Sequence, residues 1–410
     1  MTHGLSMIYS DRTFSHRTQA SLHPVFSLPA LRRGGAFWIG LGLLGVLCSS
    51  AVMAAPSPIQ SDFDDDAVLV TLPESAPASD GARSSPEAMA REIQRLISEA
   101  RRSGDPRFLG YAERLFNQQA SQGLTDPLLV LRATLAQSLH RFDAARQDLE
   151  TVLDRSDAPA QRTQALLTLA NIEMVQGHYD RAQPLCEQLT AEYPGLIASS
   201  CQAQVAARTG SAKAAYNELT AATRSLSNVS IQGYLWAQGT LGDIAAQLGR
   251  GSAAEHWQRV LSQDPDDLYT RAQLADWYLQ NRKPRQALVA TEGYEAVDNL
   301  AVIRAVALHR LNHPDAPALA SRLRERFEEA LWRGSMLHQR DLSRFELDIE
   351  QRPKDALQHA MANWDTQREP LDTRLALRAA IAAQDNTALG QVRGWLKQQN
   401  QSDARYPEES

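Results

Sequence analysis

Residues 163–196 read TQALLTLANIEMVQGHYDRAQPLCEQLTAEYPGL, and the order of small, large and turn-forming residues in this stretch decides the fold. Leu166 and Ala170 lie on one face of a first predicted helix, because side chains four positions apart meet on a helix. Gly177 marks a turn, and a second amphipathic helix runs from there to Pro194. The stretch therefore predicts two antiparallel helices joined by a short turn.

The same pattern recurs along the chain with a period of about 34 residues. Small residues stand where the two helices of a unit must approach closely, and large apolar residues fill the other contacts. The weaker copies are the first and the fourth. The copies lie at 90–123, 126–159, 163–196, 196–229, 235–267 and 268–301, within a repeat region expected to span 86–300.

The region after the last copy is less regular, but its apolar residues still recur three and four positions apart. Prolines fall at the predicted breaks or in first turns, where a helix tolerates them. We expect degenerate helical repeats or a C-terminal cap over 301–400, followed by a flexible tail over 401–410. The helices are predicted at 299–311, 316–333, 336–350, 354–366, 371–383 and 387–398.

The repeat pattern resembles that of the tetratricopeptide (TPR) superfamily, closely over 90–300 and more loosely over 300–400. Two further stretches are similar to a group of uncharacterised bacterial exported TPR proteins: SGDPRFLGYAERLF (103–116) and ALQHAMANWDTQREPLDTRLALRAA (356–380). The TPR resemblance implies an all-α solenoid of about six to eight antiparallel helix pairs. It also implies a right-handed superhelix whose concave face, lined by first helices, holds a peptide or a protein segment.

The residues expected to line this concave groove stand at equivalent positions of successive first helices. They are Thr134, Gln137, Asn171, Met174, Gln204, Asp243 and Asp276. The two aspartates make the later part of the groove acidic, which predicts a partner segment with some basic character. The carboxylate clamp known in the superfamily is absent, because Leu167 stands where a lysine is expected beside Asn171. Trp236 fits either the groove or the core.

Residues 31–55, LRRGGAFWIGLGLLGVLCSSAVMAA, have the composition of a secretory signal. Cleavage before Ala55 is expected, because Val52 and Ala54 occupy the positions that a signal peptidase selects. We therefore expect 1–54 to be a signal peptide with a long leader and the mature protein to be periplasmic. The apolar run approaches the ~20 residues that span a membrane, so an uncleaved inner-membrane anchor facing the periplasm is the main alternative. A twin-arginine signal fits less well.

Residues 55–85 form a predicted disordered linker, because Pro, Ser, Ala and Asp leave too little apolar surface for a core. Its aspartate cluster lacks the glycine and the distal glutamate of a calcium-binding loop. The leader carries four arginines and one aspartate, so its removal takes the formal net charge from −6 to −9. An acidic mature chain disfavours nonspecific nucleic-acid binding.

Cys186 and Cys201 are the only cysteines that remain once the leader and its Cys48 are removed. An oxidising compartment permits them to pair. They belong to successive predicted helices, and the midpoint between them falls on the turn at 193–194, so they stand level across the helix pair. We predict a disulfide between them. Two buried free thiols are the alternative, because cysteine fills small apolar gaps well.

The sequence contains no phosphate-binding loop, nucleophile elbow or metal-binding cysteine pair. His309 and His313 have a spacing compatible with zinc but no third ligand nearby, so we expect surface histidines. We predict no enzyme activity, cofactor or metal, and an enzyme within 300–400 is the least favoured alternative.

The sequence favours an exported scaffold that binds a protein or peptide segment in its groove. The alternative is a structural accessory subunit of a cell-envelope secretion or polysaccharide assembly.

Overall fold

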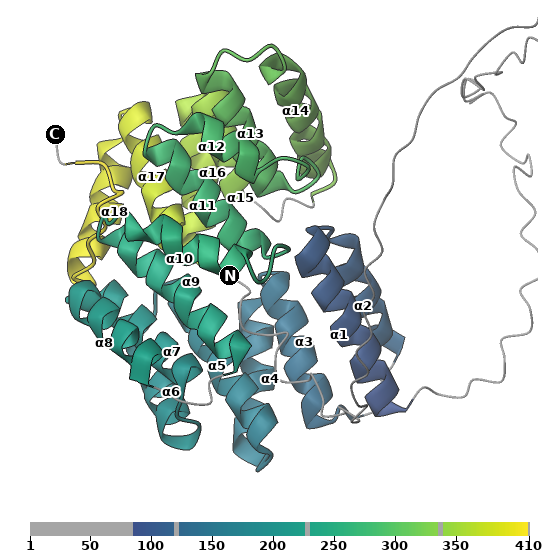
Figure 1. Ribbon diagram of the computed structural model, residues 1–410. Helices are drawn as coiled ribbons and strands as arrows, with labels where there is room; N and C mark the ends of the chain where they lie inside the picture. Colours follow the sequence, from purple (N-terminus) through teal and green to yellow (C-terminus); the bar gives the residue numbers. More distant parts are fainter. Residues whose placement is uncertain (1–84, 119–122, 226–229, 335–338, 409–410) are drawn as a thin grey trace, which may run out of the picture. The chain divides into compact units, whose positions relative to one another are not determined.

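The computed structural model describes residues 85–118, 123–225, 230–334 and 339–408. The predicted signal peptide and all of the predicted linker except Ser85 lie outside these residues. Within the described ranges every regular element is helical, as the repeat predicts (Figure 1). None of the helices in these ranges is long and apolar enough to cross a membrane.

Each of the six predicted copies contains two helices. They are α1 (Pro86–Ser103) and α2 (Arg107–Gln118), α3 (Asp126–Ser138) and α4 (Phe142–Arg155), α5 (Pro159–Gln176) and α6 (Tyr179–Glu192), α7 (Leu196–Ala206) and α8 (Ala212–Ser225), α9 (Ile231–Gln247) and α10 (Ser252–Leu261), and α11 (Leu268–Gln280) and α12 (Pro284–Ala290). A π-helical turn, η1 (Ala207–Ser211), joins α7 to α8. At this turn Gly210 adopts a φ of 98°, which bends the chain between the two helices.

Helix pairs continue through the region predicted to be degenerate. They are α13 (Asp298–Arg310) and α14 (Ala316–Trp332), α15 (Gln339–Phe345) and α16 (Pro353–Thr366), and α17 (Pro370–Ala383) and α18 (Asn386–Gln398). The π-helical turn η2 (Glu346–Glu350) extends α15, where the sequence predicts one helix over 336–350. Proline stands in the first turn of α14, α16 and α17, where its missing N–H costs no helical hydrogen bond.

The helix pairs stack in chain order, so the described residues form an α-solenoid. The first helix of each pair contacts the first helix of the next, from α1 to α3 and onward to α17. Close approach within a pair depends on small residues, as the repeat predicts. A Cβ atom added to Gly242 of α9 would lie 2.5 Å from Nε1 of Trp257 on α10, so no larger residue fits there.

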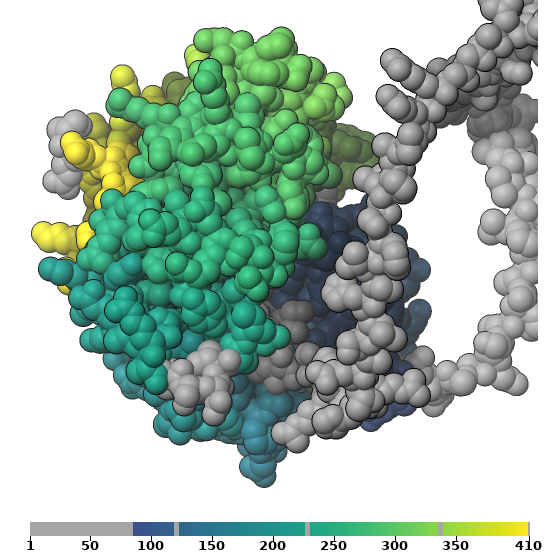
Figure 2. All heavy atoms as spheres, in the orientation of Figure 1, coloured from purple at the N-terminus to yellow at the C-terminus, as the bar shows by residue number. Residues whose placement is uncertain are grey.

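The C-terminal helices pack back onto the middle repeats instead of extending away from them. One hydrophobic core contains Leu166 and Met174 of α5 together with Trp364 of α16 and Trp395 of α18. The backbone N–H of Arg368 donates to the carbonyl of Val175 at 2.6 Å. In Figure 1 the yellow α17 and α18 lie beside the teal middle helices. Figure 2 shows the same contact on the surface, where yellow spheres lie against teal and green ones.

The segment after α18 is also packed into the protein. Gln401 and Asp403 are buried, and the phenol of Tyr179 donates to Oε1 of Gln401 at 3.2 Å. The prediction of a flexible tail is therefore wrong for 401–406. A sequence rich in polar residues predicts exposure, but here the polar groups find hydrogen-bond partners inside the solenoid.

Candidate functional site

The residues predicted to line a groove do lie on first helices, but the surface that they form is largely covered. Met174 contributes to the core shared with α16 and α18, and Trp236 also lies in that core. The hydroxyl of Thr134 donates to the carbonyl of Val130 in its own helix. Thr134, Gln137, Met174 and Asp276 are buried, whereas Asn171, Gln204 and Asp243 are partly buried. The prediction of an open groove is wrong at the buried positions, because periodicity identifies a helix face and not what covers it.

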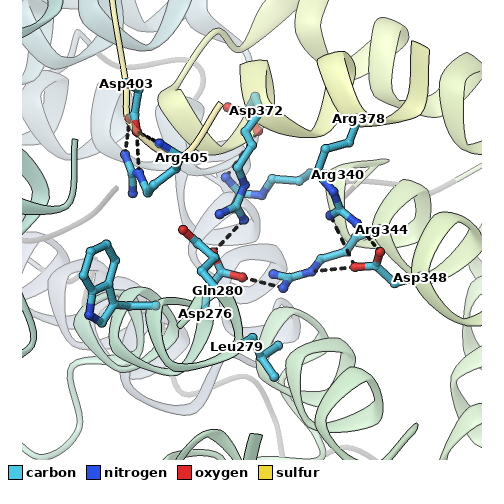
Figure 3. Close-up of polar contacts among 12 residues, drawn as sticks. Asp276, Leu279, Gln280, Arg340, Arg344, Asp348, Asp372, Arg378, Asp403 and Arg405 are labelled. Atoms are coloured by element: carbon cyan, nitrogen blue, oxygen red, sulfur yellow. Dashed lines mark hydrogen bonds and ion pairs between the residues drawn. The ribbon is translucent and has the colours of Figure 1, made fainter. Parts of the chain in front are cut away.

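Asp276 shows the clearest departure from the prediction. Its carboxylate is 2% exposed and accepts a hydrogen bond from Arg344 (Figure 3). It also accepts one from Arg374, at 2.6 Å. Nε2 of Gln280, one turn further along α11, donates to the same carboxylate. Burial alone would raise the pKa of Asp276, but the two guanidinium groups hold it well below its usual range. The prediction that a basic partner segment binds at this position is wrong, because the protein's own arginines neutralise the aspartate.

Asp243 lies in a different environment, so the structure does not bring the two aspartates into one acidic surface. The phenol of Tyr269 and the indole N–H of Trp257 donate to its two oxygens at 3.0 and 3.2 Å. It borders a partly open pocket that Gln204 and Arg208 also line. Burial raises the pKa of Asp243 to about 6, although its hydrogen bond from Tyr269 opposes the shift.

Gln247 of α9 binds the main chain of the C-terminal segment with both its side-chain amide and its backbone carbonyl. Its side-chain amide donates to the carbonyl of Ser402 at 2.8 Å, and its backbone carbonyl accepts from the N–H of Ala404 at 2.8 Å. The same amide also donates to the carbonyl of Ala207 at 2.7 Å, which fixes its orientation. A short non-helical segment, in which Ser402 and Ala404 are exposed, is therefore held against the solenoid through its backbone.

A second cavity, of about 470 Å³, is lined by Asp276 together with several arginines, and we call it the arginine cavity. Its basic lining residues are Arg310 of α13, Arg344 of α15, Arg374 and Arg378 of α17, and Arg405 of the C-terminal segment. Sequence reasoning missed this cluster, because its members come from four separate parts of the chain. The only local signal is the spacing of Arg374 and Arg378, which places both on one face of α17.

The remaining predictions concern cysteines and histidines. A disulfide joins Cys186 of α6 to Cys201 of α7, with Cα atoms 5.5 Å apart and both residues buried. His309 is exposed, and Nδ1 of His313 lies 3.6 Å from a carboxylate oxygen of Asp315. Among the residues that the structure describes, no group of three or more potential ligands is placed to hold a metal ion.

Comparison with known proteins found no matching family model and no matching curated protein. Similar solved structures include a human IFIT1 dimer with PPP-AAAA, at 11% identity over 76% of this chain and 84% of that chain, with a TM-score of 0.44. Another is the P58(IPK) TPR domain, at 14% identity over 75% of this chain and 91% of that chain, with a TM-score of 0.20. The chain has a TPR-type architecture. That statement rests on its own repeat and on its stacked helix pairs.

Proposed function

We propose that this protein is a non-catalytic binding scaffold that holds a non-helical protein segment between its middle repeats and its C-terminal helices. The supporting observation is that Gln247 already holds such a segment, the protein's own residues 402–404, through main-chain hydrogen bonds. Main-chain contacts do not depend on side-chain identity, so they suit a site that accepts segments of different sequence. The bond between Tyr179 and Gln401 supplies selectivity beside them. A partner segment would compete with the C-terminal segment for this site.

This proposal predicts that the C-terminal segment binds when it is supplied as a separate molecule. A chain that ends at Gln398 should bind a labelled peptide of residues 399–410, and the full-length chain should bind it at least ~tenfold more weakly because its own segment occupies the site. The matched control is the same peptide with Ala404→Pro, which lacks the N–H that donates to Gln247. Fluorescence anisotropy measures each affinity.

The full-length Ala404→Pro chain provides a second measurement that does not depend on the folding of a shortened chain. Its C-terminal segment remains attached but has lost one main-chain bond, so this chain should bind the unmodified peptide more tightly than the parent chain does. Equal affinity for the unmodified and the proline peptides, in folded proteins, would show that main-chain recognition by Gln247 is not the basis of binding.

We also propose that the mature protein begins at Ala55 and acts in the periplasm. The support is the signal-like composition of 31–55 and a buried pair of cysteines in a disulfide, a bond that persists in oxidising compartments. N-terminal sequencing of the protein from its native host should find Ala55 first. An intact leader on a protein held in the inner membrane would replace this proposal with the anchored form.

A further inference from the structure

The arginine cavity carries more positive than negative charge. Four of its five guanidinium groups form ion pairs with three carboxylates, those of Asp276, Asp348 and Asp403. Arg310 forms no ion pair within the described residues, and its Nη1 donates to the carbonyl of Leu279 at 2.7 Å. Two of the five positive charges are therefore not balanced by a carboxylate in direct contact.

Two of the arginines that line the cavity also carry buried N–H groups without an acceptor. Arg374 is only 7% exposed, and one of its nitrogens binds Asp276, but its Nε and Nη1 have no hydrogen-bond partner. Nε of Arg344 likewise lacks one, since the nearest oxygen of Asp348 is 3.6 Å away. Leaving a buried charged donor unpaired costs free energy, so such groups are expected to meet an acceptor in the functional state.

Arg374 and Arg310 are also repelled by neighbouring arginines. Burial lowers the pKa of Arg374, and the nearby Arg344, Arg405 and Arg378 lower it further, although Asp276 opposes them. Burial also lowers the pKa of Arg310, and Arg344 and Arg378 lower it further, although Asp348 opposes them. The pKa values of Arg344 and Arg405 are instead raised, because Asp276 and Asp403 outweigh the effect of burial there. An anion bound among these side chains would remove this repulsion, and the planar guanidinium fork matches carboxylate and phosphate oxygens.

We propose that the arginine cavity binds a small molecule with two negative charges, of the dicarboxylate or phosphate-monoester type. The charge excess sets the ligand charge at two, and the guanidinium groups that line the cavity supply the donors for its oxygens. A volume of about 470 Å³ falls within the range of small-molecule sites and is too small for a folded partner. This proposal does not rest on peptide binding by Gln247.

The test measures binding of inorganic phosphate and of succinate to the full-length protein by calorimetry, with sodium chloride used to keep the ionic strength constant. We expect a saturable site, and at least ~tenfold weaker binding in Arg310→Gln and in Arg374→Gln. Arg333→Gln is the matched control, because it removes the same charge from a surface arginine paired with Glu329, and it should bind as the parent does. Arg310→Gln keeps the comparison valid if Arg374→Gln fails to fold.

Three results would overturn the proposal. The first is an effect of chloride equal to that of the dianions, and the second is unchanged affinity in a folded Arg310→Gln variant. The third is tighter binding of a single-stranded oligonucleotide that the same substitutions weaken, which would assign the cavity to nucleic-acid backbone instead. Phosphate bound more tightly than succinate, or the reverse, supports the proposal and selects the ligand type.

Discussion

Replacing Asp276 by alanine should lower the free energy of unfolding by about 3–5 kcal/mol, because it leaves Arg344 and Arg374 buried without their shared carboxylate. Urea unfolding followed by circular dichroism measures the loss. The matched control is Asp143→Ala, which removes an aspartate whose side chain is 96% exposed and lies 2.7 Å from Arg146. An exposed pair of this kind contributes only ~0.2–1 kcal/mol. Equal losses of unfolding free energy in the two variants would show that the buried ion pairs of Asp276 stabilise the protein no more than an exposed pair does.

The difference in unfolding free energy between the parent chain and Asp276→Ala should depend on pH and become smaller in acid. The arginines hold the folded-state pKa of Asp276 below the ordinary value of an aspartate, which is about 3.9. Its contribution to stability is therefore fully present above that ordinary value and is lost as the pH falls through the lower folded-state value. The difference between the parent chain and Asp276→Ala should stay constant from about pH 5 to pH 8 and shrink below about pH 4.

Reducing the Cys186–Cys201 bond should destabilise the protein by about 3 kcal/mol, the chain-entropy value for a loop near 15 residues. Unfolding midpoints with and without reductant measure this effect. The control is the double variant Cys186→Ala, Cys201→Ala, whose midpoint should not respond to reductant. Thiol counting on the unreduced, denatured mature protein comes first, since two free thiols there would refute the bond.

Helices are the part of this fold that the sequence predicts well. The helix predicted at 371–383 is observed at Pro370–Ala383, because a proline fixes its start and apolar residues recur with helical spacing. The helix predicted at 336–350 is less regular, since α15 ends at Phe345 and a π-helical turn follows. Apolar spacing does not distinguish the two hydrogen-bond patterns over a single turn.

The candidate site could not be predicted in the same way. Arg374 lies 98 residues after Asp276 in the chain, so no local pattern relates them. The predicted acidic groove and the observed arginine cavity share Asp276, yet they imply partners of opposite charge. Periodicity correctly placed Asp276 on a first helix, but the sign of the surface depends on which distant helices pack against it.

The position of the C-terminal segment has a consequence for the order in which the molecule folds. In an open repeat array each unit touches only its neighbours, so folding can spread outward from any unit. Here a hydrogen bond from Tyr179 reaches a residue 222 positions later, and one from Gln247 reaches a residue 155 positions later. Contacts this distant in sequence slow folding, because a long loop must close before they form.

During synthesis the middle repeats are made before α16–α18, which cover them. Until these helices form, Met174 and its apolar neighbours are exposed to water. A chain that ends before α16 would lack the helices that cover this surface. Proteases and chaperones recognise exposed apolar surface of that kind. The C-terminal helices thus complete the burial of the middle repeats.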